Sequence, residues 1–407
     1  MTTLDTREQT RKRLIGTLFA GNAIASTAYI GIATVGALIA EQITGSTALS
    51  GLAPTVGTLG VAAAATYLSW MSSKTGRRPA FTAGFMLAVL GAILSIVSIS
   101  TDNFLLLLAG MLGVGAGRSV TQLARYAAGD MRPQEGRAKA IGIIVWASTV
   151  GAVIGPPLIG PTSSLAATAG LDELIGPLVV AVIGFALVAI LMAIGLRPDP
   201  MKLVVDDGPH ESGARVSKIS SLLASRSTQL SVIAVITSQT VMVLVMVMTP
   251  LHIRANDGSL ATVGWVMMAH AIGMFAIAPV TGLLVSRVGA RVMIGTAVGV
   301  FVASCALAFT ASTASTPILV VSMFGVGVAW NFGFVAGSTL LQDGVAVQDR
   351  LKLQGFTDSS AWISGAVAAG LSGLVLANTS YATLAFLGAV LALIPLIPMY
   401  RLRTAPA

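Results

Sequence analysis

Residues 103–129 read NFLLLLAGMLGVGAGRSVTQLARYAAG, and this stretch decides the class of the fold. Its only charged residues are Arg118 and Arg125. A helix needs about 20 apolar residues to cross the hydrocarbon core of a bilayer, whereas a barrel strand needs about 10 in an alternating pattern. The stretch has the length of the former and lacks the alternation of the latter. It therefore predicts a membrane-spanning helix.

The whole chain has the composition of a membrane protein. Of its 407 residues, 55% are hydrophobic and 10% are charged. A soluble domain carries about 25% charged residues. This composition excludes a soluble enzyme, a secreted disulfide scaffold and a disordered regulator. The single cysteine, Cys305, has no partner for a disulfide or a thiol metal site, and we expect a small buried side chain.

Charges, prolines and glycine clusters divide the chain into twelve apolar segments. We expect helical spans at 14–40, 47–71, 79–100, 103–129, 138–161, 175–196, 229–251, 261–285, 292–312, 316–342, 353–376 and 380–400. The basic start at residues 11–13 resembles a signal peptide, but the apolar run after it is too long, so we expect a retained first helix. The prediction is an all-α integral membrane protein with twelve transmembrane helices.

Lysine and arginine fall almost entirely on one side of these spans. That side receives residues 7–13, the turns near 74–78, 132–139, 287–291 and 350–352, the basic residues of 197–226, and both arginines of 401–403. The other side receives only Arg254. Because basic loops stay in the cytoplasm, we expect a multi-pass protein of the cell membrane with both termini cytoplasmic. The same split accounts for the net charge of +8 without a nucleic-acid partner.

The two halves of the chain repeat one another. Residues 197–228 form the only long polar stretch between spans, so we expect a cytoplasmic linker between bundles at 1–196 and 229–407. Three motifs recur across it, 212 to 214 positions apart: Met111–Gly115 with Met323–Gly327, Ser73–Arg78 with Ser286–Arg291, and Gln134–Lys139 with Gln348–Lys352. Three matches in order at nearly one offset indicate a parallel internal repeat.

These features together resemble the major facilitator superfamily. Its signature turn after span 2, Gly-x-x-x-Asp-Arg/Lys-x-Gly-Arg/Lys-Arg/Lys, corresponds here to Ser69-Trp-Met-Ser-Ser73-Lys74-Thr-Gly76-Arg77-Arg78. The basic residues and Gly76 match, whereas Ser69 and Ser73 replace the Gly and the Asp. The resemblance implies two pseudo-symmetric six-helix bundles that expose a solute alternately to each side. It also implies a gating role for the basic residues Lys74, Arg77 and Arg78.

Span 5 contains Gly151-Ala-Val-Ile-Gly155-Pro156-Pro157, which looks like the family's antiporter signature and is associated with exporters. The resemblance implies that Gly151, Gly155 and Pro156 help to close a gate. The residues alone allow a simpler interpretation, because glycines one turn apart let a neighbouring helix approach and a proline can bend the helix. The arginine of the family's span-4 motif is absent, since Ala109 stands in its place.

Polar residues at membrane depth are the candidates for function. Arg118 lies about 22 Å beyond Asn103, and Gln122 and Arg125 share its helix face. Two cations facing lipid would cost several kcal/mol, so we expect this face to line a wet cavity or meet an anion. Arg125 could instead extend to the cytoplasmic interface, and we also assign it to the gate.

The predicted substrate-binding set extends over four spans. Trp330 is the repeat partner of Arg118, and an aromatic ring beside an amide suits a substrate wall, although a packed core tryptophan is the alternative. In the resembled family, spans 1, 4, 7 and 10 line the central path. The set comprises Arg118, Gln122, Asn22, Tyr29, Gln239, Trp330 and Asn331.

Three residues are candidates for proton coupling: His270, Asp358 and Glu41. A histidine at depth can carry a proton near neutral pH, or it can be a neutral ring bonded to a hydroxyl or carbonyl. Asp358 begins span 11 at the cytoplasmic surface, so it could also supply the ion pair that Ser73 denies to the basic turn. We therefore expect Asp358 to take part in the gate.

The sequence predicts a secondary transporter, with proton-coupled export of an amphipathic or anionic compound as the first expectation. Import of an organic anion by symport or uniport is the alternative, and a non-transporting receptor or scaffold is the rival from another class. No nucleotide loop, zinc pattern or catalytic triad stands out, so we expect no enzyme, no cofactor and no metal site. The expected partners are a small molecule, protons and the bilayer, and the expected state is a monomer.

Overall fold

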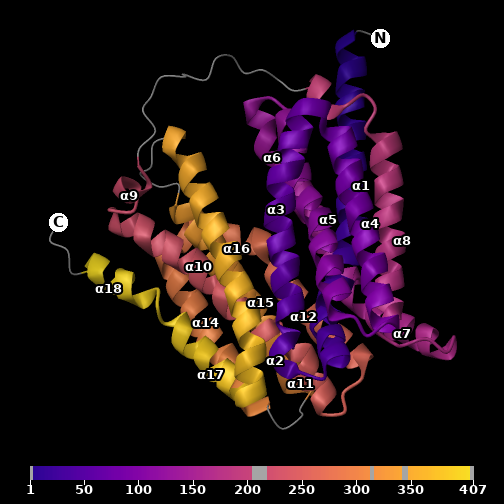
Figure 1. Cartoon of the computed structure of the whole chain (residues 1–407). Helices are drawn as coiled ribbons and strands as arrows, with labels where there is room; N and C mark the ends of the chain where they lie inside the picture. The colour runs from indigo at the N-terminus through magenta and orange to yellow at the C-terminus, as the bar shows by residue number, and fades with distance from the viewer. Residues whose placement is uncertain (1–2, 204–217, 312–315, 342–346, 404–407) are drawn as a thin grey trace. The chain divides into compact units, whose positions relative to one another are not determined.

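The computed structural model describes residues 3–203, 218–311, 316–341 and 347–403. Within these ranges the backbone forms helices joined by turns, with no strand (Figure 1). Twelve helical segments of the described chain are long and apolar enough to cross a membrane. The all-helical, twelve-span fold predicted from the sequence is confirmed.

The chain divides into two compact units. Unit 1 consists of Met1–Gly45 and Val56–His210, and unit 2 of Ser46–Thr55 and Glu211–Ala407. The start of span 2 thus belongs to unit 2, where the hydroxyl of Thr55 donates to the carbonyl of Ala366 at 3.0 Å. Of the predicted linker, residues 204–217 lie outside the described residues.

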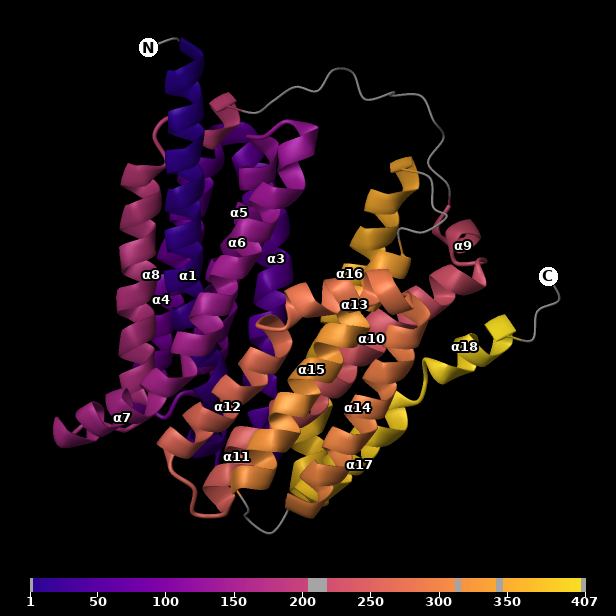
Figure 2. The ribbon, with the colours of Figure 1, turned by 180° about the vertical axis from the view of Figure 1, so that it is seen from behind.

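Unit 1 contains the helices of the first six spans. They are α1 (Thr3–Thr44), α3 (Leu52–Thr75), α4 (Arg77–Ser100), α5 (Phe104–Asp130), α6 (Gln134–Ile154), η1 (Pro156–Leu158), α7 (Ile159–Thr168), α8 (Ile175–Gly195) and η2 (Pro200–Leu203). The short α2 (Thr47–Ser50) belongs to unit 2 with the first residues of α3. Within unit 1, α1, α4 and α8 run side by side (Figures 1 and 2).

Unit 2 contains the helices of the last six spans. They are α9 (Ile219–Leu222), α10 (Arg226–Met246), α11 (Thr249–Ala255), α12 (Leu260–Phe275), α13 (Ala278–Val288), α14 (Ala290–Thr310), α15 (Thr316–Leu340), α16 (Val347–Asn378), α17 (Tyr381–Ala392) and α18 (Leu396–Arg403). One core cluster joins α10, α13, α14 and α15 through buried aliphatic side chains such as Leu230, Ile294 and Leu340.

Four spans are interrupted near a proline. Pro156 opens a 3-10 turn after α6, and Pro250 and Pro279 lie in the first turns of α11 and α13. Pro395 lies between α17 and α18. A proline lacks an N–H and crowds the carbonyl four residues earlier, so a helix breaks or bends there. From the sequence, a bend was predicted only at Pro156.

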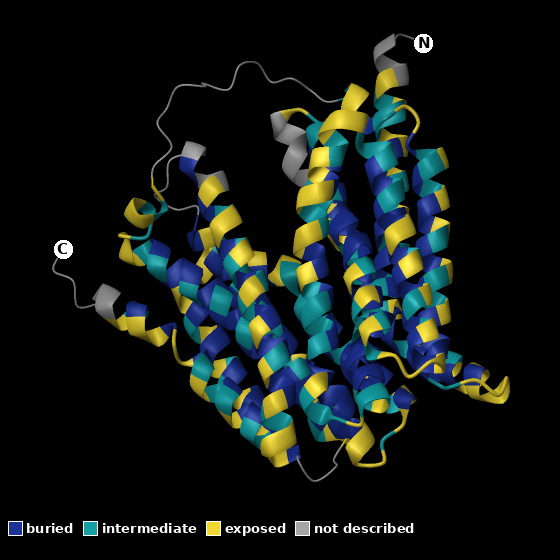
Figure 3. Ribbon diagram, viewed as in Figure 1, coloured by how far each residue is buried: buried dark blue, intermediate teal, exposed yellow. Residues whose placement is uncertain are grey.

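The helices expose apolar stripes, as expected where lipid is the solvent. In α8, the exposed side chains are Val179, Ile183, Leu187, Ile190 and Ile194, which recur every three or four positions and so share one face. The opposite face of α8 is buried, and in Figure 3 the buried and exposed faces appear as alternating colours along the helix. An apolar helix with one exposed apolar face fits contact with hydrocarbon and not with water.

The internal repeat appears in two close helix contacts. A Cβ atom added to Gly115 of α5 would lie 2.6 Å from the carbonyl oxygen of Gly57 in α3. A Cβ atom added to Gly327 of α15 would lie 2.3 Å from the carbonyl oxygen of His270 in α12. These two contacts are related by the repeat offset. The glycine-rich run of span 4 therefore serves close helix packing, as its position inside a span indicates.

Candidate functional site

A charged residue inside a span of unit 1 contacts a tyrosine of the neighbouring helix. Arg118 of α5 is half-buried, and its guanidinium carbon lies 5.2 Å from the centre of the Tyr29 ring in α1. The glycine face of α5 packs against α3 and α4, which leaves this polar face to α1. The Nε atom of Arg118 is shielded and lacks a hydrogen-bond partner among the described residues. No carboxylate of the described chain forms an ion pair with it.

Gln122 and Arg125 continue the same face of α5, and both are half-buried. The guanidinium carbon of Arg125 lies 4.9 Å from the centre of the Tyr126 ring, and Nη2 donates to the tyrosine hydroxyl at 3.1 Å. Arg125 thus lies along its own helix. Arg118 and Gln122 thus share one face of α5, and Arg118 contacts Tyr29 of α1. The role of all three in substrate binding stays a prediction.

Asn22 is held by its neighbours. Its amide nitrogen donates to the carbonyl of Ile144 and to the hydroxyl of Ser148, each at 2.9 Å, so it joins α1 to α6. Gly151 lies in the same contact, because a Cβ atom added there would lie 2.5 Å from the backbone nitrogen of Thr27. This geometry favours a packing role for Asn22 over contact with a solute.

Gly155 extends the same α1–α6 contact. A Cβ atom there would lie 2.8 Å from the carbonyl oxygen of Thr27, and the helix breaks at the next residue, Pro156. The Gly151–Pro157 motif therefore packs span 5 closely on span 1. Its proposed gating role stays a prediction.

Unit 2 carries an aromatic cluster built on α15. The indole Nε1 of Trp330 donates to the amide oxygen of Gln239 in α10 at 2.9 Å. The Phe334 ring stacks on the indole with the ring centres 4.8 Å apart, and the Phe275 ring meets it edge-on at 6.0 Å. Neither phenylalanine was predicted from the sequence as a site residue. The spacing of four residues between Trp330 and Phe334 was the available signal for one of them.

Asn331, beside Trp330, is fully occupied by its neighbours. It is 2% exposed, its Nδ2 donates to the carbonyl of Met274 at 2.7 Å, and its Oδ1 accepts from the hydroxyl of Thr281. Met274 lies in the last turn of α12, where carbonyls lose their helical partners. Asn331 therefore satisfies the broken backbone of span 8, and this geometry favours packing over solute contact.

The proton-coupling candidates differ in their surroundings. His270 is 2% exposed, and its Nδ1 lies 3.0 Å from the carbonyl oxygen of Met323, to which it can donate. Its Nε2 is shielded and has no hydrogen-bond partner among the described residues. Asp358 and Glu41 are half-buried. Within the described ranges, no group of three or more His, Cys, Asp or Glu side chains could hold a metal ion.

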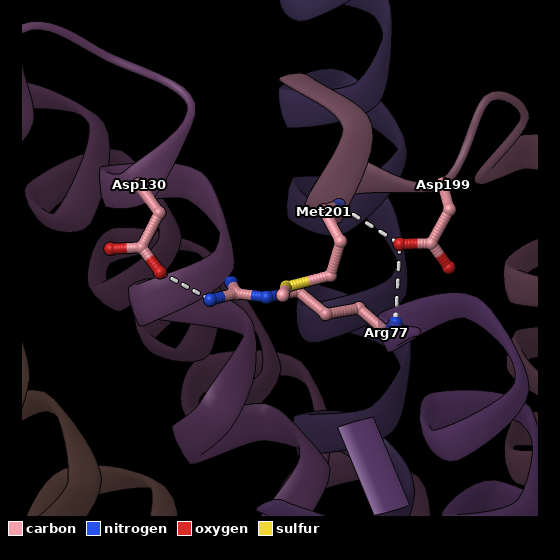
Figure 4. A network of polar contacts seen from close by, with 4 residues as sticks. All are labelled: Arg77, Asp130, Asp199 and Met201. Carbon is pink, nitrogen blue, oxygen red and sulfur yellow. Dashed lines mark hydrogen bonds and ion pairs between the residues drawn. The ribbon is translucent and has the colours of Figure 1, made fainter. Parts of the chain in front are cut away.

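The basic turn between α3 and α4 is held by two carboxylates of unit 1 (Figure 4). The guanidinium of Arg77 forms an ion pair with Asp130 at the end of α5. The carboxylate of Asp199 accepts from the backbone nitrogens of Arg77 at 3.2 Å, Arg78 at 2.8 Å and Met201 at 2.9 Å. Asp199 was not among the predicted site residues, and only its place between two prolines after span 6 marks it in the sequence.

Two further residues, Lys74 and Asp358, were predicted for the gate. Lys74 is exposed, and the hydroxyl of Ser73 donates to the carbonyl of Trp70 in its own helix at 2.7 Å. Asp358 lies in α16 of unit 2. Its pairing with the basic turn stays a prediction.

Comparison with known protein families gives one result for the whole chain. The model of the Major Facilitator Superfamily matches residues 18–255 and 230–407. An uncharacterized MFS-type transporter of Bacillus subtilis, YdeG, is 35% identical over 375 residues, which cover 90% of this chain and 86% of that protein. A second one, YddS, is 33% identical over 371 residues, covering 90% of this chain and 85% of that protein.

A more distant relative has a named solute. The riboflavin transporter RfnT of Brucella anthropi is 25% identical over 373 residues, which cover 90% of each chain. Among solved structures, an auto-inhibited peptide transporter of the POT family has a TM-score of 0.73 at 10% identity, covering 97% of this chain and 98% of its own. A bacterial homologue of the lysosomal transporter Spinster, inward-facing and unoccupied, has a TM-score of 0.71 at 14% identity, covering 98% and 99%. These two structures show the fold alone.

Proposed function

The chain belongs to the major facilitator superfamily, and from this premise we propose that it exports a small organic anion in exchange for protons. The family membership makes it a multi-pass membrane transporter. The solute class, the direction and the coupling ion are the parts that we propose. We also propose that the basic end of the bundles faces the cytoplasm, because the lysine and arginine residues gather there.

The observation that carries the proposal is an uncompensated cation at membrane depth. Arg118 contacts the Tyr29 ring, and no carboxylate of the described chain pairs with it. A guanidinium removed from water is costly, and a cation–π contact of about 0.5–2 kcal/mol offsets only part of this cost. A bound anion would offset more of it. The planar guanidinium is suited to a carboxylate or phosphate group bound at two points.

Export and proton exchange have weaker support, which comes from the sequence. The Gly151–Pro157 motif is similar to the antiporter signature of the family. Among the coupling candidates, a protonated His270 would place a new charge in a site where its Nδ1 already binds a carbonyl and its Nε2 meets no acceptor. Asp358 and Glu41 can each lose a charge on protonation, so we propose them ahead of His270.

The aromatic cluster of unit 2 favours a second candidate, the uptake of a planar heteroaromatic solute by symport or uniport. Trp330 is half-buried, and Phe334 covers one of its faces. A planar ring could stack on the other face, and such stacked pairs contribute about 0.5–1.5 kcal/mol beyond their buried area. The Brucella relative, a riboflavin transporter, supports this class of solute.

A pair of flavins separates the two candidates. Riboflavin and flavin mononucleotide share the ring system, and only the second carries a phosphate. We expect flavin mononucleotide to stabilise the purified protein against heat more than riboflavin does, and Arg118→Ala to abolish the difference. Arg291→Ala, which removes an exposed arginine of unit 2, is the matched control. Equal stabilisation of the wild-type protein by both flavins would contradict the anion proposal and favour the second candidate. If neither flavin binds, salicylate and its neutral amide repeat the comparison with a smaller ring.

Direction and coupling need vesicles of known orientation. The solute that binds is added either inside or outside inside-out vesicles, whose outer surface is the basic side. We expect net movement of the solute into the vesicles, and we expect a proton gradient directed out of the vesicles to accelerate it. Indifference to a gradient of about two pH units would remove proton exchange and leave uniport. Binding without any movement of solute would favour the receptor or scaffold alternative.

A further inference from the structure

We infer that Asp199 is a positioning residue for transport, and that its carboxylate replaces the one that the basic turn lacks at Ser73. Asp199 fixes the backbone of Arg77, whose side chain then reaches Asp130 at the end of α5. This inference rests on the proposed transport, but not on the identity of the solute.

The contacts of Asp199 are specific to the first residues of α4. Its two carboxylate oxygens accept from the backbone nitrogens of Arg77 and Arg78, and these N–H groups have no partner inside the helix. An acidic group at a helix start also complements the partial positive charge there. Gly76 allows the approach, because a Cβ atom added to it would lie 2.6 Å from Oδ2 of Asp199. Gly76 also has a φ of 97°, which side chains rarely adopt.

The turn itself contains no acidic residue. Residues 69–78 include three basic side chains, and the hydroxyl of Ser73 is bonded to its own helix. The carboxylate that neutralises this turn from outside therefore comes from Asp199, more than one hundred residues further along the chain. Asp130 provides the second carboxylate, through the side chain of Arg77.

Asp199 also fastens the start of the linker to unit 1. The side chain of Arg13 in α1 donates to the carbonyl of Arg197, and Glu8 of α1 pairs with Arg132, two residues after Asp130. Together with the Asp199 and Arg77 contacts, these bonds form a closed ring through α1, the end of α5, the start of α4 and residues 197–199. Tension on the linker would thus reach the basic turn and α5.

α5 connects this ring to Arg118. Asp130 ends α5 twelve residues after Arg118, which is about 18 Å along the helix axis. A continuous helix moves as one body over this distance. The position of Asp199 is therefore coupled to that of the Arg118 face.

The second copy of the turn shows that a carboxylate is not required to form it. Gly289 starts α14 with a φ of 87°, close to the 97° of Gly76. Among the described residues, a Cβ atom added to Gly289 would meet no other heavy atom within 4 Å, so none of them contacts this turn as Asp199 contacts the first. Ala290 stands where Arg77 stands in unit 1. Asp199 therefore positions Arg77, and it is not needed for the turn to adopt its shape.

The test uses a readout that needs no solute. A cysteine placed at Gln122, in a Cys305→Ser background, is labelled with a membrane-impermeant maleimide in inside-out vesicles. Asp199→Asn removes the charge and part of the cap. Since losing a helix cap costs about 0.5–2 kcal/mol, we expect the labelling rate to rise about 2- to 30-fold. A rise is expected because the basic end of unit 1 loses the tie to α5.

Asp172→Asn is the matched control. Asp172 accepts from the backbone nitrogen two residues on, at 2.8 Å from Leu174, just as Asp199 accepts from Met201. It lies at the opposite end of unit 1, so we expect its labelling rate to stay within about twofold of the parent, as for a surface substitution. Adding Ser73→Asp to Asp199→Asn should return the rate at least halfway to the parent value.

Asp130→Asn gives an independent check, because it breaks the same path one step later. We expect it to raise the labelling rate, and we expect the double variant with Asp199→Asn to show no further rise, since residues of one network are not additive. This check also covers the case in which Asp199→Asn does not fold. The inference would be overturned if the labelling rate is unchanged in either single variant, or if it rises equally in Asp172→Asn. It would also be overturned if the effects of the two substitutions multiply in the double variant, or if Ser73→Asp does not restore the rate. Equal stabilisation by riboflavin and flavin mononucleotide, together with a positive labelling result, would contradict the proposed anionic solute and leave this inference standing.

Discussion

The indole nitrogen of Trp330 donates a hydrogen bond to the amide oxygen of Gln239, 2.9 Å away, and so fixes an aromatic ring of α15 against α10. The Phe334 ring stacks on the same indole. Gln239 is only 8% exposed, so water has little access to its side of the bond. The aromatic cluster of unit 2 is therefore held in place by a hydrogen bond to Trp330.

Gln239→Leu should destabilise the protein by about 1–3 kcal/mol, because it leaves the indole N–H unpaired in an apolar site. Trp330→Phe should also destabilise, because it leaves the amide oxygen unpaired. The double variant should lose less than the sum of the two, which thermal unfolding in detergent would measure as a coupling energy. Additive losses would show that the bond is not made in the folded protein.

Tyr29→Phe should leave the contact with Arg118 largely intact, because the ring and its negative face remain. Tyr29→Leu should remove it, and stability should fall by about 0.5–2 kcal/mol more than in Tyr29→Phe. The two variants are compared first by thermal unfolding without solute and then by their affinity for the solute. Equal effects of the two variants would show that the hydroxyl, and not the ring, matters.

Gly115→Ala should destabilise unit 1 by about 1–3 kcal/mol, because its Cβ atom would overlap the backbone of α3. Gly142→Ala is the control within a helix, since a Cβ atom there meets no other heavy atom within 4 Å. It should be neutral or slightly stabilising, as alanine favours helix over glycine. If thermal unfolding ranks the two variants equally, the close contact of α5 with α3 is absent in the membrane.

Neutralising the coupling candidates one at a time should locate the proton site. In vesicles, Asp358→Asn or Glu41→Gln should make transport independent of a pH gradient while solute exchange continues. His270→Gln should lower thermal stability, because the Nδ1 contact with Met323 is disturbed, and should keep the gradient response. Loss of the response in His270→Gln alone would return the histidine to the pathway.

Asp358→Asn should also favour the inward-open state, if this residue supplies an ion pair to the gate. An interaction of a few kcal/mol is enough to bias a two-state equilibrium. The measurement is labelling of the cysteine at position 122 from the basic side, in the background without Cys305. Glu173→Gln, an acidic residue at the opposite surface, is the control. A labelling rate that does not rise in Asp358→Asn would remove this residue from the gate.

The sequence predicted the fold from features that act locally. Apolar runs long enough for a bilayer predict helices whatever they pack against, and the three motifs at one offset predict the repeat seen at Gly76 and Gly289. The glycine-rich run of span 4 predicted close helix packing, because a glycine inside a span has few other roles. The breaks near Pro250, Pro279 and Pro395 follow from the same property of proline as the break at Pro156, so they could have been predicted too.

Which polar side chains remain available to a solute could not be predicted in this way. Asn22, Asn331 and Arg118 look alike in the sequence, as polar residues at depth on predicted spans. Asn22 and Asn331 donate to backbone carbonyls or hydroxyls of neighbouring helices, whereas the contact that the described residues give the Arg118 guanidinium is with an aromatic ring. Hydrogen-bond partners lie on other helices, and their identity depends on how the helices are packed.

The sequence by itself determined the membrane environment, the number of spans and the two related halves, because hydrophobicity and charge act through the surrounding solvent. Only the tertiary structure decided which carboxylate serves the basic turn. Ser73 shows that the turn lacks an acid, but nothing local shows that Asp199 replaces it. That contact exists because α8 returns the chain to the start of α4, where unpaired backbone N–H groups attract a carboxylate.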